Sequence, residues 1–326
     1  GPRPVSPETR ERVLRAIEQL GYKPNHFARA LARRKTQTIA LIIPDNANPF
    51  FAQLSRAVEE TAFEAGLTLV LCNSSQDPKR EVVYFSALQS KRIDGVLLIT
   101  SGLDASQVHA LVDSGIPLVV LDREIPNVYV DTVLVDNVSL GYAATKHLLQ
   151  HGHRTIACLS GPSSLLNSVE RVKGYKQALS ESGIATDESL ICCGDFTFEG
   201  GYSAAKKILA KDTRPSALVA SNDLMAIGAI HAVREIGLSV PNDLAIVSID
   251  DILLAKISVP PLTTVAQPIW EMGQTATRLL VDRIRGNASP TPRRIVLNGN
   301  LVVRESCGCR VASSATSSDI RATEVR

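Results

Sequence analysis

The stretch that decides the fold is TIALIIPDNANPFF, residues 38–51. Its first half, 39–43, is a short β-branched apolar run, which is typical of a strand buried on both faces inside a parallel sheet. The run stops at Pro44, which cannot donate to a strand ladder, and passes into a polar loop that ends at Phe50 and Phe51. Apolar residues at three- and four-residue spacing follow, and this spacing predicts a helix.

The loop after this first strand carries groups that suit a ligand. In open α/β sheets, ligands bind in the crevice beyond the carboxyl ends of the strands. The amide of Asn48 can both donate and accept hydrogen bonds, and it stands beside Phe50 and Phe51, a combination that suits the hydroxyl edges and apolar face of a sugar. The alternative is that Asn48 caps the helix and the two phenylalanines are ordinary core residues.

Length and composition favour a multidomain protein outside the membrane. With 326 residues and 44% hydrophobic content, the chain can bury a large core and form more than one domain. No apolar run approaches the ~18 residues that a membrane span requires, and the start shows no signal-peptide pattern. Most of the six cysteines lie within or beside apolar runs, as reduced cysteines of cytosolic proteins do. We therefore expect a cytoplasmic protein with no membrane partner.

The sequence favours neither a metal site nor a cofactor. Cys307-Gly308-Cys309 has the composition of a metal-binding or disulfide motif, but no second pair of Cys or His at ligand spacing is evident beside it. Four histidines are expected on helix surfaces or caps: His109, His147, His151 and His153.

The net charge of +2 hides an uneven distribution. Residues 1–35 contain nine basic and three acidic residues, which leaves 35 − 9 = 26 basic and 33 − 3 = 30 acidic residues in the remainder. A basic head on a mildly acidic body indicates a polyanionic partner for the head. A solvated charged helix is the competing interpretation.

The head begins with a helix. Ser6 is placed as N-cap, Pro7 at the first helical position and Gly21 at the end. One apolar stripe runs along this helix, through Val13, Leu14, Ile17 and Leu20. Because a single helix with a stripe cannot fold alone, we expect a head that is incomplete at its N-terminal side.

From residue 38 onward, strands alternate with helices, which predicts a parallel doubly wound sheet. The pattern starts afresh near Gly152, so we expect two such domains. The predicted strands are 39–43, 67–72, 95–100, 117–121, 133–137, 156–160, 190–193, 217–220, 244–249, 261–267, 295–297 and 301–303, with 67–72 buried and the last two closing the second domain. Neither GxGxxG after a strand nor GxxxxGK[ST] occurs, which disfavours a dinucleotide or P-loop enzyme.

The ends of the predicted strands share one kind of side chain: planar hydrogen-bonding groups and aromatic rings. These residues are Asn48, Phe50, Phe51, Asp122, Arg123, Arg171, Phe196, Asn222, Asp250 and Gln267. Charged groups give the strongest hydrogen bonds to hydroxyls, and aromatic rings pack on apolar sugar faces. The set holds no His, Cys or Ser as nucleophile or base. Its carboxylates have the composition of a glycosidase pair, but each has an Arg or Asn neighbour, so we expect a binding protein rather than an enzyme.

The head resembles a known family at residues 21–31. GYKPN followed by ARAL is similar to the end of the headpiece of the lactose-repressor (LacI/GalR) family of transcription regulators. The resemblance implies a helix-turn-helix unit that reads DNA, and a hinge helix that enters the minor groove with a leucine wedge. It assigns hinge contacts to Asn25, Ala28, Arg29 and Leu31.

The body is similar to the type I periplasmic-binding-protein fold that this family shares with sugar receptors. The motifs NPFF, LDRE, ERVKGY, GDF, SNDLMAIGA, SIDD and TVAQ match the pattern of ribose-binding members at the ten positions named above. One departure is Ser248-Ile249, where Gly and an aromatic residue are usual. We expect this change to alter one wall of the pocket.

The resemblance implies a DNA-binding regulator, most simply a repressor of a sugar-utilisation operon, with D-ribose as effector. The expected partners are operator DNA and a second copy of the chain, with a tetramer left open. Rival hypotheses are a purine or phosphosugar effector, a sugar-transport receptor and a sugar-processing enzyme. The expected organisation is a helix-turn-helix remnant at 1–24, a hinge at 25–37, a first subdomain at 38–150 plus 268–290, a second at 151–267 plus 291–306, and a flexible tail at 307–326.

Overall fold

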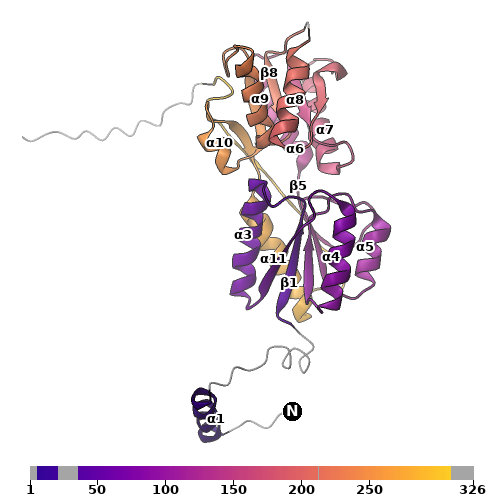
Figure 1. Cartoon of the computed structure of the whole chain (residues 1–326). Coiled ribbons are helices and arrows are strands. Elements are labelled where there is room, and N and C mark those ends of the chain that lie inside the picture. Colours follow the sequence, from indigo (N-terminus) through magenta and orange to yellow (C-terminus); the bar gives the residue numbers. More distant parts are fainter. Residues whose placement is uncertain (1–5, 21–35, 212, 310–326) are drawn as a thin grey trace, which may run out of the picture.

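The structure, a computed structural model, describes residues 6–20, 36–211 and 213–309. The body consists of two α/β lobes stacked end to end, each built on a six-stranded sheet with helices on both faces (Figure 1). All strand pairs are parallel except β10 with β12. The predicted fold class, two doubly wound parallel-sheet lobes, is confirmed.

The first lobe is the one next to the N-terminal segment. Its sheet has the order β11 (Arg294–Leu297), β5 (Asp131–Val135), β4 (Leu118–Leu121), β3 (Gly95–Leu98), β1 (Thr38–Ile43) and β2 (Thr68–Asn73). Its helices are α3 (Pro49–Glu64), α4 (Pro78–Ser90), α5 (Ala105–Val112) and α11 (Ile269–Arg285).

The second lobe repeats this plan. Its sheet has the order β12 (Asn300–Val302), β10 (Thr263–Ala266), β9 (Ala245–Asp250), β8 (Ala217–Ala220), β6 (Ile156–Ser160) and β7 (Ile191–Cys193). Its helices are α6 (Asn137–Gln150), α7 (Leu166–Glu181), α8 (Phe198–Leu209), α9 (Asp223–Glu235) and α10 (Leu253–Ile257), with a short 3₁₀ turn at Glu188–Leu190.

Strand β1 is buried on both faces, as its β-branched run predicts. Leu41 belongs to the core cluster beneath α3 and α11, whereas Ile42 packs in a separate cluster beneath α4 and α5. Both side chains are fully buried. The strand lies between β2 and β3, so its carboxyl end is held from both sides.

The prediction of a buried strand at 67–72 is wrong in one respect. Strand β2 forms at this place, but it is the edge of the sheet and only β1 pairs with it. Val70 is 39% exposed and Leu71 is 46% exposed. An apolar run is equally consistent with a central strand and with an edge that another surface covers, and the sequence does not separate the two.

Two predicted domain limits also need correction. Helix α6 was placed with the first subdomain, but it packs against α7 and the strands of the second sheet. The chain therefore changes lobes before Asn137, 152 − 137 = 15 residues earlier than the restart near Gly152 suggested. The segment 291–306 is divided, because β11 pairs with β5 in the first sheet and β12 pairs with β10 in the second. The lobes are consequently joined at three crossings: β5 to α6, β10 to α11, and β11 to β12.

The ends of the described chain partly match expectation. Helix α1 (Pro7–Gln19) forms, and Ser6 Oγ accepts a hydrogen bond from the backbone N–H of Thr9 at 3.3 Å. The hinge residues Asn25, Ala28, Arg29 and Leu31 lie outside the described residues. The predicted tail starts too early, because Cys307 is buried against the second lobe. Within the described part of the chain, every helix is too short or too polar to cross a membrane.

Helices α6 and α7 cross with their backbones in contact. A Cβ added to Gly141 would lie 2.0 Å from the carbonyl oxygen of Arg171, and one added to Gly174 would lie 2.0 Å from that of Val138. Real Cβ atoms do not approach this closely, so both positions require glycine. The crossing fixes where α7 presents Arg171.

We predict that Gly141→Ala lowers the free energy of unfolding by about 3 kcal/mol, the upper end of the cost of overpacking, because a backbone atom cannot yield as a side chain does. Urea denaturation measures the change. The control is Gln150→Ala, an exposed position on the same helix, which should change stability by less than about 0.5 kcal/mol. Equal effects of the two substitutions would contradict the crossing.

Candidate functional site

One cavity between the lobes collects every residue predicted at the strand ends. Its lining consists of Asn48, Phe50, Phe51, Asp122, Arg123, Asn167, Arg171, Phe196, Asn222, Asp250 and Gln267. The first five come from the first lobe and the others from the second or from the β10–α11 crossing. The cavity measures about 30 Å³, room for about two water molecules. The space between the lobes is therefore nearly filled by these side chains.

Two asparagines of the site are also helix caps. Asn48 Oδ1 accepts from the backbone N–H of Phe50 at 3.0 Å, and Asn222 Oδ1 accepts from that of Met225 at 3.0 Å. The cap alternative for Asn48 is thus confirmed, together with its place in the cavity wall. Because capping fixes each carbonyl oxygen toward its helix, the amide nitrogens are the groups left for other partners. Asn222 Nδ2 donates to the carbonyl of Phe196 at 3.0 Å.

Aromatic rings frame the cavity on both lobes. Phe50 and Phe51 meet edge to face with centroids 5.2 Å apart. The guanidinium of Arg123 lies 5.7 Å from the centre of the Phe51 ring, and that of Arg171 lies 5.9 Å from the centre of Phe196. Phe51 and Phe196 thus each make a cation–π contact with one arginine of the site.

The Phe196 ring has its place because of a glycine at the end of β6. A Cβ on Gly161 would come within 2.2 Å of Phe196 Cζ. The backbone around the site is also unusual: Asp122, Phe196 and Asp250 all have positive φ, at 60°, 66° and 130°. Such conformations cost free energy in residues other than glycine and cluster at binding sites.

The guanidinium of Arg171 contacts residues at the ends of one helix and two strands. Its Nε donates to Asn137 Oδ1 at 2.9 Å, and its Nη1 donates to the carbonyl of Ser221 at 2.5 Å. Nη1 also lies 3.8 Å from Asp250 Oδ1, an oxygen that accepts from Gln267 Nε2 at 2.7 Å. The guanidinium is 4% exposed, so these partners replace its water.

The site buries two acids and two arginines. Asp122 and Arg123 form a second pair, with Oδ2 and Nε 3.8 Å apart. Burial raises the pKa of Asp122, although Arg123 and Arg171 oppose the shift. Burial likewise raises the pKa of Asp250 well above its ordinary value, and Arg171 is the main opposing charge. Burial lowers the pKa of the Arg123 guanidinium, which Asp122 partly offsets.

Three buried polar atoms of the cavity have no hydrogen-bond partner among the described residues. They are Asp122 Oδ1, Arg123 Nε and Gln267 Oε1. Leaving such atoms unpaired costs about 1–3 kcal/mol each, and more for charged groups. Two are acceptors and one is a donor, so a ligand that completes the site must both donate and accept hydrogen bonds.

The sequence missed Asn167 and Asn137. Asn167 lines the cavity one helical turn before Arg171, at the i, i+4 spacing that places two side chains on one helix face. That spacing was the signal available. Asn137, which anchors Arg171, had no signal beyond its place at the end of a strand.

The departure at Ser248-Ile249 does not shape the pocket wall as predicted. Both residues are fully buried, and neither lines the cavity. Ser248 Oγ instead donates to Asp223 Oδ1, whose other oxygen accepts from the backbone N–H of Ile252 at 2.8 Å. Thr264 Oγ1 also donates to Asp223 Oδ1, at 2.7 Å. These hydrogen bonds connect β9 and β10 to the start of α9, next to the site residues Asn222 and Asp250.

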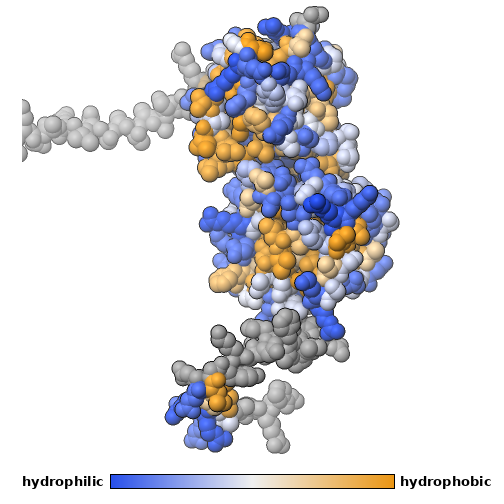
Figure 2. Space-filling model, viewed as in Figure 1, coloured by the Kyte–Doolittle hydropathy of each residue, from blue (hydrophilic) through white to orange (hydrophobic). Residues whose placement is uncertain are grey.

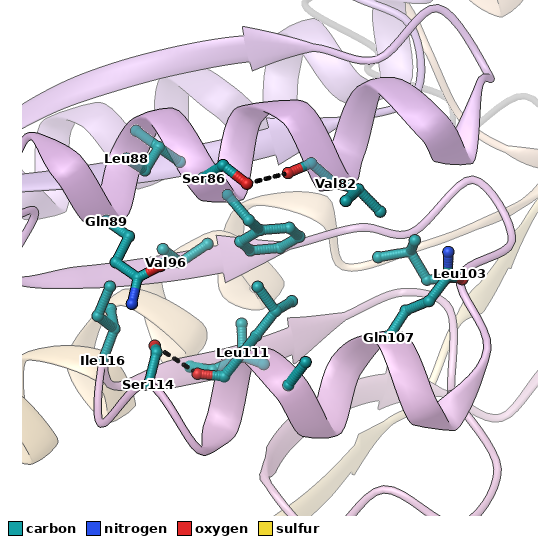
Figure 3. Close-up of a pocket in the computed structure, with 13 residues that line it drawn as sticks. Val82, Ser86, Leu88, Gln89, Val96, Leu103, Gln107, Leu111, Ser114 and Ile116 are labelled. Atoms are coloured by element: carbon teal, nitrogen blue, oxygen red, sulfur yellow. Dashed lines mark hydrogen bonds between the residues drawn. The ribbon is translucent and has the colours of Figure 1, made fainter.

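A larger cavity lies elsewhere, in the first lobe between α4 and α5 (Figure 3). It measures about 310 Å³, and Phe85, Leu103 and Leu111 contribute to its wall. None of its lining residues is charged, and the hydroxyls of Ser86 and Ser114 are already bonded to carbonyls of their own helices. It lacks the convergent polar groups of the interlobe cavity.

Comparison with known proteins agrees with the fold. The sequence profile for periplasmic binding proteins and the sugar-binding domain of the LacI family matches residues 36–300. The chain belongs to the LacI family. It is similar to the transcriptional regulator DegA of Bacillus subtilis, at 40% identity over 306 residues that cover 93% of this chain and 90% of DegA.

Solved structures of LacI-family regulators resemble the chain as well. The complex of the transcriptional regulator CelR with cellobiose has a TM-score of 0.76 at 38% identity, and covers 93% of this chain and 91% of that one. A LacI-family regulator from Enterococcus faecium with bound ribose has a TM-score of 0.75 at 32% identity, covering 82% and 98%. These relatives are transcriptional regulators and not enzymes, which agrees with the prediction of a regulator.

The network beneath this LacI-family site makes a testable prediction. Burial raises the pKa of Asp223 to about 6, against the hydrogen bonds of Ser248, Thr264 and Ile252. The folded state therefore binds a proton more tightly than the unfolded state, and the carboxyl contributes stability that grows as the pH falls from above 6 towards 4. From pH 7.5 to 4.5, the free energy of unfolding should rise by about 2 kcal/mol relative to that of Asp223→Asn. Urea denaturation of both proteins at each pH gives the difference, and a constant difference would contradict the assignment.

Proposed function

We propose that this LacI-family regulator represses a sugar-utilisation operon and responds to a monosaccharide, D-ribose, bound in the interlobe cavity. The observation that carries the proposal is the set of three unpartnered polar atoms in a cavity framed by Phe50, Phe51 and Phe196. A sugar hydroxyl can donate to Asp122 Oδ1 or Gln267 Oε1 and accept from Arg123 Nε. The apolar face of the ring suits the phenylalanines.

The charge of the cavity favours a neutral ligand. Two carboxylates and two guanidiniums line it, and they lie opposite one another in pairs 3.8 Å apart. When both aspartates are ionised, each arginine already has a carboxylate as its partner, and a phosphosugar would add negative charge to a site with no net positive charge. This balance supports a free sugar over a phosphorylated one.

The cavity is smaller than a sugar ring in this structure. A ring enters only when the lobes part, and the three crossings between the lobes are where the chain can bend. A pentose needs a smaller separation than a disaccharide. The relative from Enterococcus faecium, solved with bound ribose, supports this choice.

The proposed regulation couples this cleft to DNA. The first lobe continues directly from the segment that resembles the hinge and the basic head, and the basic head is the part suited to operator phosphates. A ligand that binds the closed lobes more tightly than the open ones shifts their equilibrium. The same shift changes the relation between the two heads of a dimer, so that sugar and operator affinities are reciprocally linked.

The dimer itself is proposed from the exposed edge of the first lobe. Besides Val70 and Leu71 on β2, the neighbouring helices expose Phe63, Val82 and Val83. Figure 2 shows apolar side chains gathered on this face, between α3 and α4. An exposed apolar edge strand invites pairing with another chain, and a twofold dimer would match a pseudo-palindromic operator.

We predict that Val70→Glu converts the protein from a dimer to a monomer, because it places a charge in the proposed interface. Val296→Glu is a matched control on β11, the opposite edge of the same sheet, where the residue is equally exposed at 39%. Light scattering coupled to size-exclusion chromatography gives both masses. A monomeric wild-type protein, or dissociation by Val296→Glu alone, would contradict this interface.

The effector is tested by thermal unfolding with pentoses, hexoses, cellobiose, sugar phosphates and purines. A ligand at about 100 times its dissociation constant stabilises the fold by about 2.7 kcal/mol. We expect ribose to give the largest shift. A shift with a purine or a phosphosugar alone would overturn the ribose assignment while keeping the family.

The site is tested separately by Arg123→Met, which removes a buried donor. We expect the dissociation constant for ribose to rise about 10- to 100-fold, from the loss of a charged hydrogen bond worth about 1.5–3 kcal/mol. The control Arg56→Met removes an exposed guanidinium of α3 that pairs with Glu60, and ribose affinity should be unchanged. Calorimetric titration measures both, and unaltered affinity in Arg123→Met would refute the site.

A further inference from the structure

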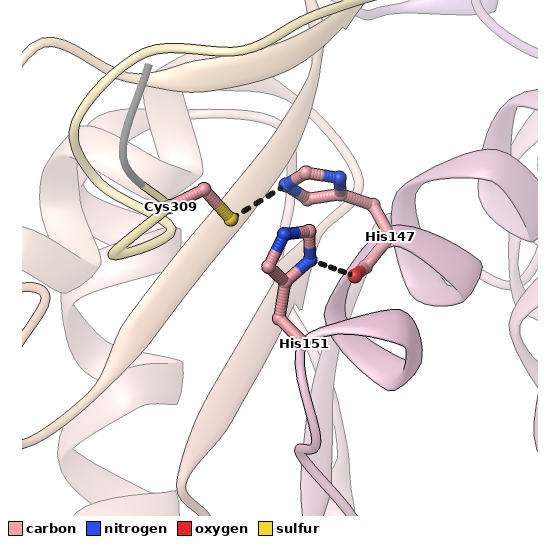
Figure 4. A group of neighbouring side chains, drawn as sticks. All are labelled: His147, His151 and Cys309. Carbon is pink, nitrogen blue, oxygen red and sulfur yellow. Dashed lines mark hydrogen bonds between the residues drawn. The ribbon is translucent and has the colours of Figure 1, made fainter. Parts of the chain in front are cut away.

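The far end of α6 gathers three side chains that bind metals. His147 lies in the last turn of this helix and His151 is its C-cap residue, and Cys309 reaches them from the C-terminal segment (Figure 4). One possible ligand atom from each lies within 4.8 Å of the other two. The sequence-based prediction of surface histidines is therefore wrong for His147, which is 5% exposed, and a His pair at ligand spacing does accompany the Cys-Gly-Cys motif.

One pair of ligand atoms already has the separation found around a shared cation. Cys309 Sγ lies 3.3 Å from His147 Nε2, and the two imidazole centroids are 4.5 Å apart. In a tetrahedral zinc site with Zn–S ~2.3 Å and Zn–N ~2.0 Å, sulfur and nitrogen lie about 3.5 Å apart. The observed pair is close to that separation.

The ring orientations also suit metal binding. His151 Nδ1 lies 2.8 Å from the carbonyl oxygen of His147. A carbonyl can only accept, so Nδ1 carries the proton and Nε2 of His151 keeps its lone pair. Metal-bound histidines commonly donate their second N–H to a carbonyl or carboxylate, which fixes tautomer and orientation.

Cys307, two residues before Cys309, is buried and anchors this segment to β10. Its sulfur accepts from Thr263 Oγ1 at 3.2 Å, and the residue is 2% exposed. Gly308 has a φ of 76°, a turn that brings the two sulfurs of the motif to the same region.

We propose that His147, His151 and Cys309 bind a thiophilic divalent cation, with Zn²⁺ the best match to two imidazoles and one thiolate. Cys307 is a positioning residue, and the fourth position belongs to solvent. The cation would cross-link the C-terminal segment to α6. It would also displace the thiol proton of Cys309, since a coordinating thiol is deprotonated outright. This proposal is independent of the identity of the sugar.

The experiment uses the reduced, tag-free chain titrated with Zn²⁺ against a chromophoric chelator, and with Co²⁺ as a spectroscopic probe. We expect one ion per chain and a sulfur-to-cobalt charge-transfer band. Cys309→Ser should abolish the band and weaken Zn²⁺ binding at least about tenfold, and His151→Gln should weaken binding to a similar degree. Circular dichroism establishes that each variant is folded.

Two controls come from the same lobe. Cys193 is an exposed thiol, and His153 Nδ1 faces Ser216 Oγ at 3.0 Å instead of the cluster. Cys193→Ser and His153→Gln should retain both the band and the affinity. Absence of stoichiometric binding, equal affinity in Cys309→Ser and Cys193→Ser, or a band that depends on Cys193 would each overturn the proposal.

Discussion

The buried guanidinium of Arg171 is the interaction on which the cleft depends. Removing a cation from water costs several kcal/mol unless hydrogen bonds and an opposite charge replace the lost solvent. Asn137, Ser221 and Asp250 supply these replacements from the ends of α6, β8 and β9. The hydrogen bonds and the charge that stabilise the Arg171 guanidinium therefore require the ends of α6, β8 and β9 to lie close together. The same residue's carbonyl lies against Gly141, so the helix crossing and the charge network are set together.

The pairing of charges within each lobe explains how the cavity can bury four ionisable groups. Asp122 faces Arg123, and Asp250 faces Arg171, so the net charge of the four groups is zero when all are ionised. In that ionisation state the site has no net charge to attract a phosphorylated ligand, and it presents strong donors and acceptors to a neutral one. Closed lobes remove water, which strengthens each of these contacts. The buried polar atoms that lack a hydrogen-bond partner in this structure are the ones that a ligand would have to pair.

Much of this arrangement could be predicted from the sequence, because strand ends in a parallel sheet meet at one edge. Side chains that follow apolar runs, such as Asp122 and Asp250, converge wherever the strands are ordered correctly. The features that could not be predicted from the sequence depend on packing between distant segments of the chain. It did not show that α6 belongs to the second lobe, that β2 is an edge, or that 291–306 is shared between two sheets. The cluster at His147 was missed because its partner, Cys309, lies 162 residues further along the chain.

The two ends of α6 connect the cleft to this cluster. Asn137 at the start of the helix holds Arg171, and His147 and His151 lie roughly 15–20 Å away at its other end, since a helix rises about 1.5 Å per residue. Strand β10 makes a parallel connection, because Thr263 contacts Cys307 while Gln267, just beyond the other end, donates to Asp250. Both connections are rigid, regular elements. A cation that fixed the C-terminal segment on α6 and β10 would therefore stiffen the second lobe's half of the cleft without contacting the cleft itself. Its effect on ligand affinity would act through the free energy of closing the lobes.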